Sequence, residues 1–331
     1  MNAAELAAKQ VNDAGGLEVN GQKYKITLFI EDNQDKAEVA VAVAQKLINQ
    51  DNVVAIIGPQ ASRNAIPVSN IAEASKIPMI SPGSTNPETT AGKSYVFRAA
   101  FIDPFQGRVM ARFTFEELNA QNVAVLYDIA SPYNRDIAEI YKAVIEEAGG
   151  QVVAFESYTT GEEDFSSQLT NIQTSGAEVL FLPNYHNEVP AQVSQAREMG
   201  INIPIIGSDS WVTIEEKDRP LLDGSYFSTH YSTDIANDIA QSFIEAYRQA
   251  YEVTPDDIAA LTYDAFGLLF NALQQQGKTD PESIRLGLAS TENFEGVTGT
   301  MEFQGSGDPV KSAVVLKIEN GEIVFFDLAS P

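Results

Sequence analysis

An internal repeat constrains the fold of this chain more than any other feature. Val53–Ile80 reads as strand, loop, helix and a second strand containing Ile77-Pro78-Met79-Ile80. Val179–Ile206 repeats that order over the same length and ends in Ile203-Pro204-Ile205-Ile206. Apolar strands that alternate with helical periodicity indicate parallel sheets covered by helices. The sequence therefore predicts an α/β fold with two similar units, although a short Ile-Pro repeat can also arise by chance.

The same alternation continues outside the repeat. Strand patterns are found at Tyr24–Ile30, Val53–Ile57, Val123–Tyr127, Val152–Tyr158, Val179–Pro183 and Ile203–Gly207. Helical spacing is found at Ala3–Ala14, Ala40–Ile48, Asn134–Ala148, Phe165–Thr174, Val189–Met199, Asp234–Tyr251 and Asp257–Gln276. Near the end of the chain, Ala313–Ile318 and Ile323–Leu328 predict a hairpin about Asn320-Gly321.

Length and composition exclude several classes of function. A chain of 331 residues exceeds what one core usually organises, so two lobes are expected. The formal net charge of -25 disfavours binding to nucleic acid and to anionic membranes, because both rely on Lys and Arg. The sequence contains no cysteine and only two histidines. It therefore excludes thiol chemistry and cysteine-bound iron–sulfur clusters, and it disfavours histidine-based metal sites. No apolar run reaches the length of a spanning helix, which is about 18 residues.

The loops that follow the two repeat units are the candidate binding segments. Open α/β sheets bind ligands at the carboxyl ends of their strands. In the first loop, Ser84 and Thr85 offer donors that suit a carboxylate, and Gly83 permits close backbone approach. Ser62, in the loop after Val53–Ile57, adds a third donor near a helix start. The competing interpretation is helix capping and turn formation.

The second loop, Gly207-Ser208-Asp209-Ser210-Trp211, has the opposite character. Asp209 can hold an ammonium group, and Tyr185 can offer a ring face or a hydroxyl to the same cation. A carboxylate-binding loop and an ammonium-binding loop on related units together predict a clamp for a zwitterion. Taken singly, Asp209 is better explained as a helix cap and Tyr185 as a packing residue.

Signatures of catalysis are missing from the sequence. It contains no GxGxxG after a strand, and no GxxxxGK[ST], HExxH or GxSxG. The acidic run Glu162-Glu163-Asp164 is typical of a solvated face. The serines of the candidate loops have no neighbouring histidine to activate them. The sequence predicts binding without an enzymatic reaction, a metal or a cofactor.

Six short motifs are distributed along the chain. They are Ile57-Gly58-Pro59, Ile80-Ser81-Pro82-Gly83-Ser84-Thr85-Asn86-Pro87, Asp103-Pro104-Phe105-Gln106-Gly107, Thr262-Tyr263-Asp264-Ala265, Glu31-Asp32-Asn33-Gln34 and Lys317-Ile318-Glu319-Asn320-Gly321. Together these motifs resemble the branched-chain amino-acid-binding (Leu/Ile/Val-binding-like) family of ABC importer solute-binding proteins, which have the type I periplasmic binding fold. The resemblance covers essentially the whole chain.

The resemblance implies two lobes that are joined by three crossovers and close over one ligand. The N-terminal lobe would comprise residues 1–103 and 233–309, and the C-terminal lobe residues 104–232 and 310–331. The positions that bind the α-carboxylate are matched by Ser62, Ser84 and Thr85. The position that pairs with the ammonium is matched by Asp209, and two positions beside the ligand are matched by Tyr133 and Tyr185. These matched residues, with Gly83, form the expected ligand-binding set: Ser62, Gly83, Ser84, Thr85, Tyr133, Tyr185 and Asp209. Asn134 departs from the family's Tyr-Gly pattern. Trp211 is expected beside the side-chain pocket, in the core or at the surface.

The resemblance also implies the partners and location of the protein. A monomeric receptor would bind a free amino acid, possibly branched-chain or other aliphatic, and deliver it to the membrane permease of an ABC importer. Such receptors are periplasmic or extracellular and membrane-associated. The open alternatives are a receptor for an amide, urea or an aromatic acid, and a sensory ligand-binding module. Family members begin with a central strand before the helix that starts here at Asn2, so we expect the intact protein to carry upstream sequence, including a secretion leader.

Overall fold

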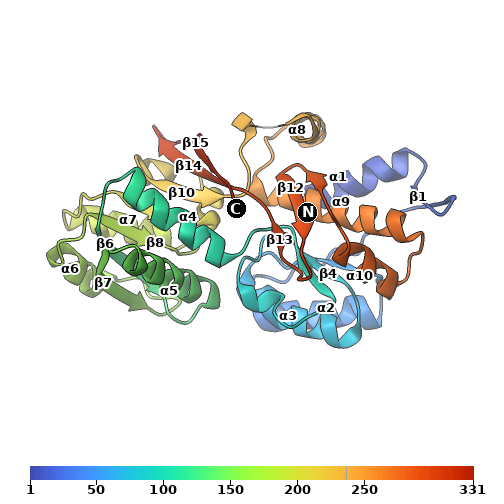
Figure 1. The fold of residues 1–331 in the computed structure, drawn as a ribbon, viewed down its shortest axis with the longest axis horizontal. Helices are drawn as coiled ribbons and strands as arrows, with labels where there is room; N and C mark the ends of the chain where they lie inside the picture. Colours follow the sequence, from blue (N-terminus) through green and yellow to red (C-terminus); the bar gives the residue numbers. More distant parts are fainter. Residues whose placement is uncertain (236) are drawn as a thin grey trace. The chain divides into compact units, whose positions relative to one another are not determined.

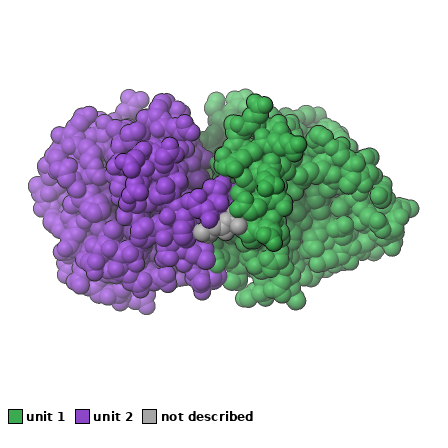
Figure 2. Space-filling view, turned by 90° about the horizontal axis from the view of Figure 1, so that it is seen from above, with its two compact units in different colours: residues 1–102, 235–312 green, residues 103–234, 313–331 purple. Residues whose placement is uncertain are grey.

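The computed structural model describes residues 1–235 and 237–331, and these divide into two compact units. Unit 1 comprises residues 1–102 and 235–312, and unit 2 comprises residues 103–234 and 313–331 (Figure 2). Each unit is therefore assembled from two separate stretches of sequence. The chain passes between the units three times, after residues 102, 234 and 312.

Unit 2 is built on one seven-stranded sheet with the order β15-β14-β10-β9-β8-β6-β7. The five strands from β7 to β10 run parallel, whereas β14 and β15 are antiparallel to their neighbours. The strands are β6 (Asn122–Asp128), β7 (Gln151–Tyr158), β8 (Val179–Leu182), β9 (Ile205–Gly207), β10 (Tyr226–Thr229), β14 (Ala313–Glu319) and β15 (Glu322–Ala329).

Four helices accompany this sheet, and α5 packs against both β6 and β7 (Figure 1). They are α4 (Asp103–Glu116), α5 (Pro132–Glu147), α6 (Ser166–Thr174) and α7 (Val189–Glu198). Three short 3₁₀ turns follow, η2 (Asp209–Thr213), η3 (Arg219–Leu222) and η4 (Thr233–Ile235), the last of which reaches the crossing after residue 234. Leu126, Leu180 and Phe227 lie in the fully buried core of the unit.

Unit 1 contains a parallel three-stranded sheet and two small antiparallel sheets. Its parallel strands are β3 (Ile56–Ile57), β4 (Met79–Ser81) and β5 (Val96–Arg98). The small sheets are formed by β1 (Leu17–Val19) with β2 (Gln22–Tyr24), and by β11 (Phe294–Gly296), β12 (Gly299–Phe303) and β13 (Pro309–Val310). The helices are α1 (Asn2–Asp13), α2 (Ala37–Asn49), α3 (Ser62–Ser75), α8 (Asp238–Tyr251), α9 (Asp257–Gln276) and α10 (Pro281–Ala289), with the short turn η1 (Pro87–Thr89).

The repeat predicted from the sequence is confirmed, because both copies form a β-strand, an α-helix and a second, parallel β-strand. In unit 1, β3 and β4 flank α3, with Ile57 aligned to Ile80. In unit 2, β8 and β9 flank α7, with Phe181 aligned to Ile206. The polar loops that follow β4 and β9 therefore leave equivalent strand ends in the two units.

The predicted C-terminal hairpin is confirmed as β14 and β15. Its turn residues, Asn320 and Gly321, have φ angles of 54° and 78°. Asn and Gly are the residues that adopt these left-handed angles most readily, which is why the dipeptide predicts the turn.

Two predicted strands differ from the structure. The prediction for Tyr24–Ile30 was wrong beyond Tyr24, because the following residues pair with no described strand. Instead, the Asn12 side chain donates to the Ile26 carbonyl at 2.9 Å and accepts from its N–H at 2.8 Å. The apolar run Val53–Ile57 yields only the two residues of β3, which pairs with β4 alone, and Val54 is 44% exposed. That run is not a strand covered on both faces.

The other predicted elements were confirmed to within a few residues, except at the start of α8. The prediction placed that start at Asp234, so it runs through residue 236, which lies outside the described residues. Sequence analysis missed α4, whose early residues include Pro104 and Gly107. Among the described residues, no helix has the length and apolar character that a membrane span requires.

Candidate functional site

In unit 1, two of the predicted donors, Ser62 and Ser84, lie together beside the end of β4. The Ser84 hydroxyl lies 2.9 Å from the Ser62 hydroxyl and 2.7 Å from that of Thr89. The loop is held by Ser81, whose hydroxyl donates to the Pro59 carbonyl at 2.6 Å and accepts from the Ser84 N–H at 3.1 Å. Ser62 is also the first residue of α3, whose N-terminal N–H groups favour a negatively charged ligand.

Thr85 completes this cluster and differs from its neighbours in one respect. Its side chain is 1% exposed, and its hydroxyl has no hydrogen-bond partner among the residues described by the structure. Buried hydroxyl groups nearly always have a partner, so each exception needs a physical reason. A buried hydroxyl donor on the residue that follows Ser84 is suited to bind the oxygen of a carboxylate.

A buried arginine, Arg98, binds the backbone of the same loop. Sequence analysis did not identify it. The Arg98 guanidinium donates to the Ser84 carbonyl at 2.5 Å, the Asn86 carbonyl at 2.9 Å and the Thr90 hydroxyl at 2.8 Å. It also lies 2.7 Å from the Asp308 carboxylate. Arg98 is fully buried at the end of β5, so it both fixes the loop backbone and makes this region less favourable for a cation.

Gly83 lies where two other side chains leave no room for a Cβ atom. A Cβ built on Gly83 would lie 2.6 Å from Gln60 Oε1 and 3.3 Å from Ile258 Cδ1. The close approach expected of this glycine is therefore made to Gln60, on the loop between β3 and α3. Gln60 is held in turn by a 3.1 Å hydrogen bond from its Nε2 to the Thr262 hydroxyl on α9.

In unit 2, Tyr133 and Asp209 lie in direct contact. The Tyr133 hydroxyl lies 2.7 Å from Asp209 Oδ1 and 2.6 Å from the Ser208 hydroxyl. Burial, reinforced by the negative charges of Asp209 and Asp103, raises the pKa of Tyr133 well above its ordinary value. Tyr133 therefore remains a neutral phenol that donates to the carboxylate.

Two further residues that sequence analysis did not assign, Gln106 and His230, adjoin Asp209, and Gln106 links it to Asp103. Gln106 accepts the Asp209 N–H at 3.4 Å and donates to the buried Asp103 carboxylate at 2.7 Å. His230 Nε2 lies 3.6 Å from Asp209 Oδ2. The Asp103-Pro104-Phe105-Gln106-Gly107 motif was the available signal for Gln106, whereas nothing in the sequence marked His230. Two carboxylates within this cluster favour a positively charged ligand group.

The remaining unit 2 residues define the edges of the cluster. The Tyr185 ring packs against Tyr133, with ring centroids 5.0 Å apart. Asn134, the departure from the family pattern, is buried and donates to the Pro183 carbonyl at 2.9 Å, which holds the loop that carries Tyr185. Trp211 is fully buried in the core of unit 2, so the alternative that it lines a ligand pocket does not hold.

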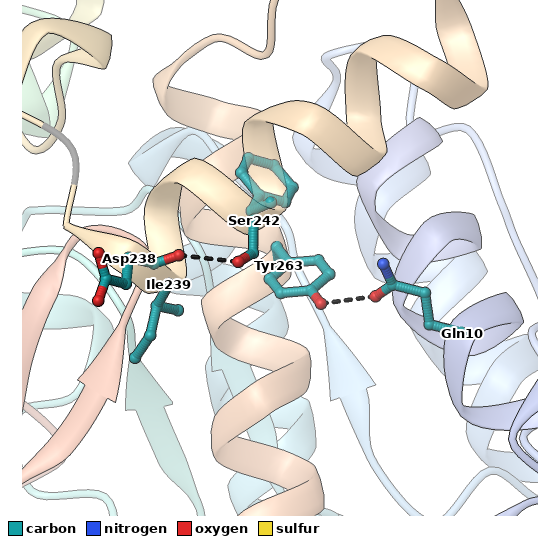
Figure 3. Close-up of a pocket in the computed structure, with 6 residues that line it drawn as sticks. Gln10, Asp238, Ile239, Ser242 and Tyr263 are labelled. Carbon is teal, nitrogen blue, oxygen red and sulfur yellow. Dashed lines mark hydrogen bonds between the residues drawn. The ribbon is translucent and has the colours of Figure 1, made fainter.

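A separate hollow of about 340 Å³ lies in unit 1 between α1, α8 and α9. Figure 3 shows residues that line it. None of the expected ligand-binding residues lines it. Its polar groups bind one another, since the Tyr263 hydroxyl donates to Gln10 at 2.6 Å and the Ser242 hydroxyl to the Asp238 carbonyl at 2.8 Å. The hydroxyl cluster of unit 1 and the Asp209 cluster of unit 2 are the better candidates for a ligand.

Comparison with known proteins agrees with the fold. The family model described as "Periplasmic binding protein" matches residues 1–322. An amino acid binding protein of Pseudomonas aeruginosa is 37% identical over 213 residues, which are 64% of this chain and 56% of that protein. The matched part thus spans little more than half of this relative.

Two solved structures are similar over the whole chain. The leucine-binding protein LivK of Thermotoga maritima has a TM-score of 0.91 and 30% identity, and the match covers 100% of this chain and 93% of LivK. LivJ of Streptococcus pneumoniae, a branched-chain amino acid transporter substrate-binding protein solved with isoleucine, has a TM-score of 0.90 and 32% identity, with the same coverage. The type I periplasmic binding fold expected from the sequence is therefore confirmed.

Proposed function

This chain belongs to the periplasmic binding protein family, and from that premise we propose that it is an extracytoplasmic receptor that binds a free amino acid for an ABC importer. The observation that carries the proposal is the opposite chemistry of the two repeat-related loops. One loop presents hydroxyl donors backed by Arg98, and the other presents Asp209. An α-amino acid has one group for each.

In this proposal the two units act as the two lobes of the receptor. Ser62, Ser84 and Thr85 hold the α-carboxylate, which gives the Thr85 hydroxyl a hydrogen-bond partner that the described residues do not supply. Asp209 holds the ammonium, while Tyr133 orients the Asp209 carboxylate and Tyr185 packs against Tyr133. No reaction follows binding, and the partner that receives the ligand is the membrane permease of the importer.

Calorimetric titration with a panel of L-amino acids and matched analogues tests the proposal. We expect an L-amino acid to bind, and the 2-hydroxy acid of the same carbon skeleton to bind far more weakly, because it lacks the ammonium. Asp209→Asn should weaken amino-acid binding by at least about 30-fold, since removing one partner of a desolvated ion pair costs about 2 kcal/mol or more.

Glu216→Gln is the matched control, because it removes one negative charge from an exposed position of the same unit. It should leave binding unchanged. If no L-amino acid binds while urea, an amide or an aromatic acid does, the proposed zwitterion recognition is wrong. Equal binding of the amino acid by wild type and Asp209→Asn would also contradict the role given to Asp209.

A further inference from the structure

The two oxygens of the Asp209 carboxylate face different partners. Oδ1 lies 2.7 Å from the Tyr133 hydroxyl, which donates to it. Oδ2 accepts no hydrogen bond from the part of the chain that the structure describes, and His230 Nε2 lies 3.6 Å from it. The Asp209 side chain keeps 12% of its surface exposed, so a ligand can reach it. Because the phenol already occupies Oδ1, Oδ2 is the oxygen that remains for the ammonium of a ligand.

His230 lies behind this carboxylate and is closed to a ligand, since its side chain is 1% exposed. It stands between Thr229, the last residue of β10, and Tyr231, a phenol that adds no charge near neutral pH. A distance of 3.6 Å is long for a hydrogen bond from a neutral imidazole, but it suits an ion pair with an imidazolium. His230 therefore acts on a ligand through the charge of Asp209 and not by touching the ligand.

The other titratable groups of this cluster do not offset the charge of Asp209. Asp103 on α4 is a second carboxylate, and its charge acts on Tyr133 together with that of Asp209. Tyr133 on α5 and Tyr185, which packs against it, are phenols and add no charge near neutral pH. Within the described residues, His230 is the only basic side chain at ion-pair distance from Asp209. Its protonation state therefore determines whether the carboxylate is paired inside the protein.

We propose that His230 makes amino-acid binding sensitive to pH, because its protonated form pairs with the Asp209 oxygen that a ligand ammonium needs. Histidine is the side chain that ordinarily changes charge between pH 5 and 8. The neutral imidazole leaves Oδ2 to the ligand, whereas the imidazolium neutralises Asp209 and repels the ammonium. The receptor therefore binds its amino acid near neutral pH and releases it in acid. The inference rests on the proposed function, since it assumes that Asp209 holds the ammonium, and it goes further by naming the residue that regulates the site.

Calorimetric titration at pH 5.5 and 7.5 tests the inference sharply, because the chain contains only two histidines, His186 and His230. The probe is L-leucine, or the member of the L-amino-acid panel that binds more tightly, and a free amino acid keeps both of its charges over this range. The wild type should bind the probe about 5-fold or more weakly at pH 5.5, within the limit of tenfold per pH unit that one proton imposes. His230→Gln, which carries no charge at either pH, should bind it with affinities that agree to within about 2-fold. His186→Gln is the matched control, since His186 is exposed on the loop after β8, and it should keep the pH dependence of the wild type.

An NMR titration of the two imidazoles supplies a measurement that needs no variant at position 230. The spectrum of His186→Gln assigns the signals of the two histidines. Because coupling between two binding events is reciprocal, saturation with the probe should move the titration midpoint of His230 to lower pH. The midpoint of His186 should stay where it is.

Unfolding midpoints of the three proteins at both pH values establish that each is folded. An affinity of the wild type that does not fall at pH 5.5, or falls equally in His230→Gln, overturns the inference but leaves amino-acid binding at pH 7.5 intact. Loss of the pH dependence in His186→Gln, or a His230 midpoint that the probe does not move, overturns it as well. Failure of every panel member to bind the wild type at pH 7.5 overturns the proposed function together with the inference.

Discussion

Gly207→Ala tests how tightly the end of β9 is packed against the turn that carries Asp209. A Cβ on Gly207 would lie 2.1 Å from Trp211 Cε2 and 2.2 Å from Cδ2, whereas ordinary contacts begin at 3.4 Å. The indole would therefore have to move by about 1.3 Å, the difference between 3.4 and 2.1 Å. Trp211 is fully buried and donates from Nε1 to the Leu182 carbonyl at 3.1 Å, so such a movement breaks that bond.

The expected cost has two parts. Overpacking a dense core costs about 1–3 kcal/mol, and leaving a buried N–H without its acceptor costs about 1–3 kcal/mol. We therefore expect Gly207→Ala to lower the free energy of unfolding by about 4 kcal/mol, measured by urea denaturation. Because Asp209 lies between Gly207 and Trp211 in sequence, amino-acid affinity should fall as well, although no ligand-binding residue is changed.

Gly176→Ala is the control for the same substitution. Gly176 has a φ of +79° and no atom within 4 Å of a built Cβ, so only backbone strain of about 1 kcal/mol is expected. Trp211→Leu replaces the indole by a smaller side chain. The Gly207→Ala/Trp211→Leu double variant should therefore lose less free energy of unfolding than the sum of the losses in the two single variants. A loss below about 1 kcal/mol in Gly207→Ala would show that Trp211 is not held as the structure has it.

Three further outcomes follow from buried groups of unit 1. Thr85→Val should leave the unfolding free energy unchanged or slightly raised, because it removes an unpaired hydroxyl, while amino-acid binding weakens by about 10- to 100-fold in calorimetric titration. Arg98→Lys should destabilise the chain by about 3 kcal/mol in urea denaturation, since an ammonium cannot reproduce the contacts of the guanidinium with three acceptors and a carboxylate. Burial lowers the pKa of Lys311 to about 8 from 10.5, so between these values the unfolded chain binds the proton more than the folded one, and this residue's contribution to stability rises with pH. From pH 7.5 to 10 the unfolding free energy of the wild type should therefore rise by about 2 kcal/mol relative to Lys311→Met, and parallel pH profiles would contradict the shift.

The predictions from sequence were confirmed where the structure is determined by residues that are close together in the chain. The hairpin about Asn320-Gly321 was predictable because the turn is determined by two residues with left-handed angles. The repeat was predictable because each strand–helix–strand unit carries its own apolar pattern. The strand predicted at Tyr24–Ile30 was wrong beyond Tyr24, where the Asn12 side chain binds both backbone groups of Ile26, a contact that the alternating pattern does not reveal.

The candidate site divides in the same way. Ser62, Ser84 and Thr85 could be grouped from the sequence because two short loops at adjacent strand ends carry them. Arg98 and Gln60 could not, because their contacts depend on tertiary packing against residues from other segments. Trp211 illustrates the same limit, because its indole is buried against Gly207 and donates to the Leu182 carbonyl, and neither contact is visible in the sequence.

The chain returns to unit 1 after residue 234 and to unit 2 after residue 312. These two returns determine the order in which the units can be completed during synthesis on the ribosome. Unit 1 begins first, yet it is finished only when residue 312 has been made, after most of unit 2. In unit 2, β10 can pair with β14 only after β14 has been synthesised. β10 ends at Thr229 and β14 ends at Glu319, which is 90 residues later (319 minus 229). At a translation speed of about 5–20 residues per second, the edge of β10 stays open for roughly 5–18 s. During that interval the unpaired edge of β10 is available to strands of other chains. The order of the segments in the sequence therefore favours pairing between chains before β14 is made.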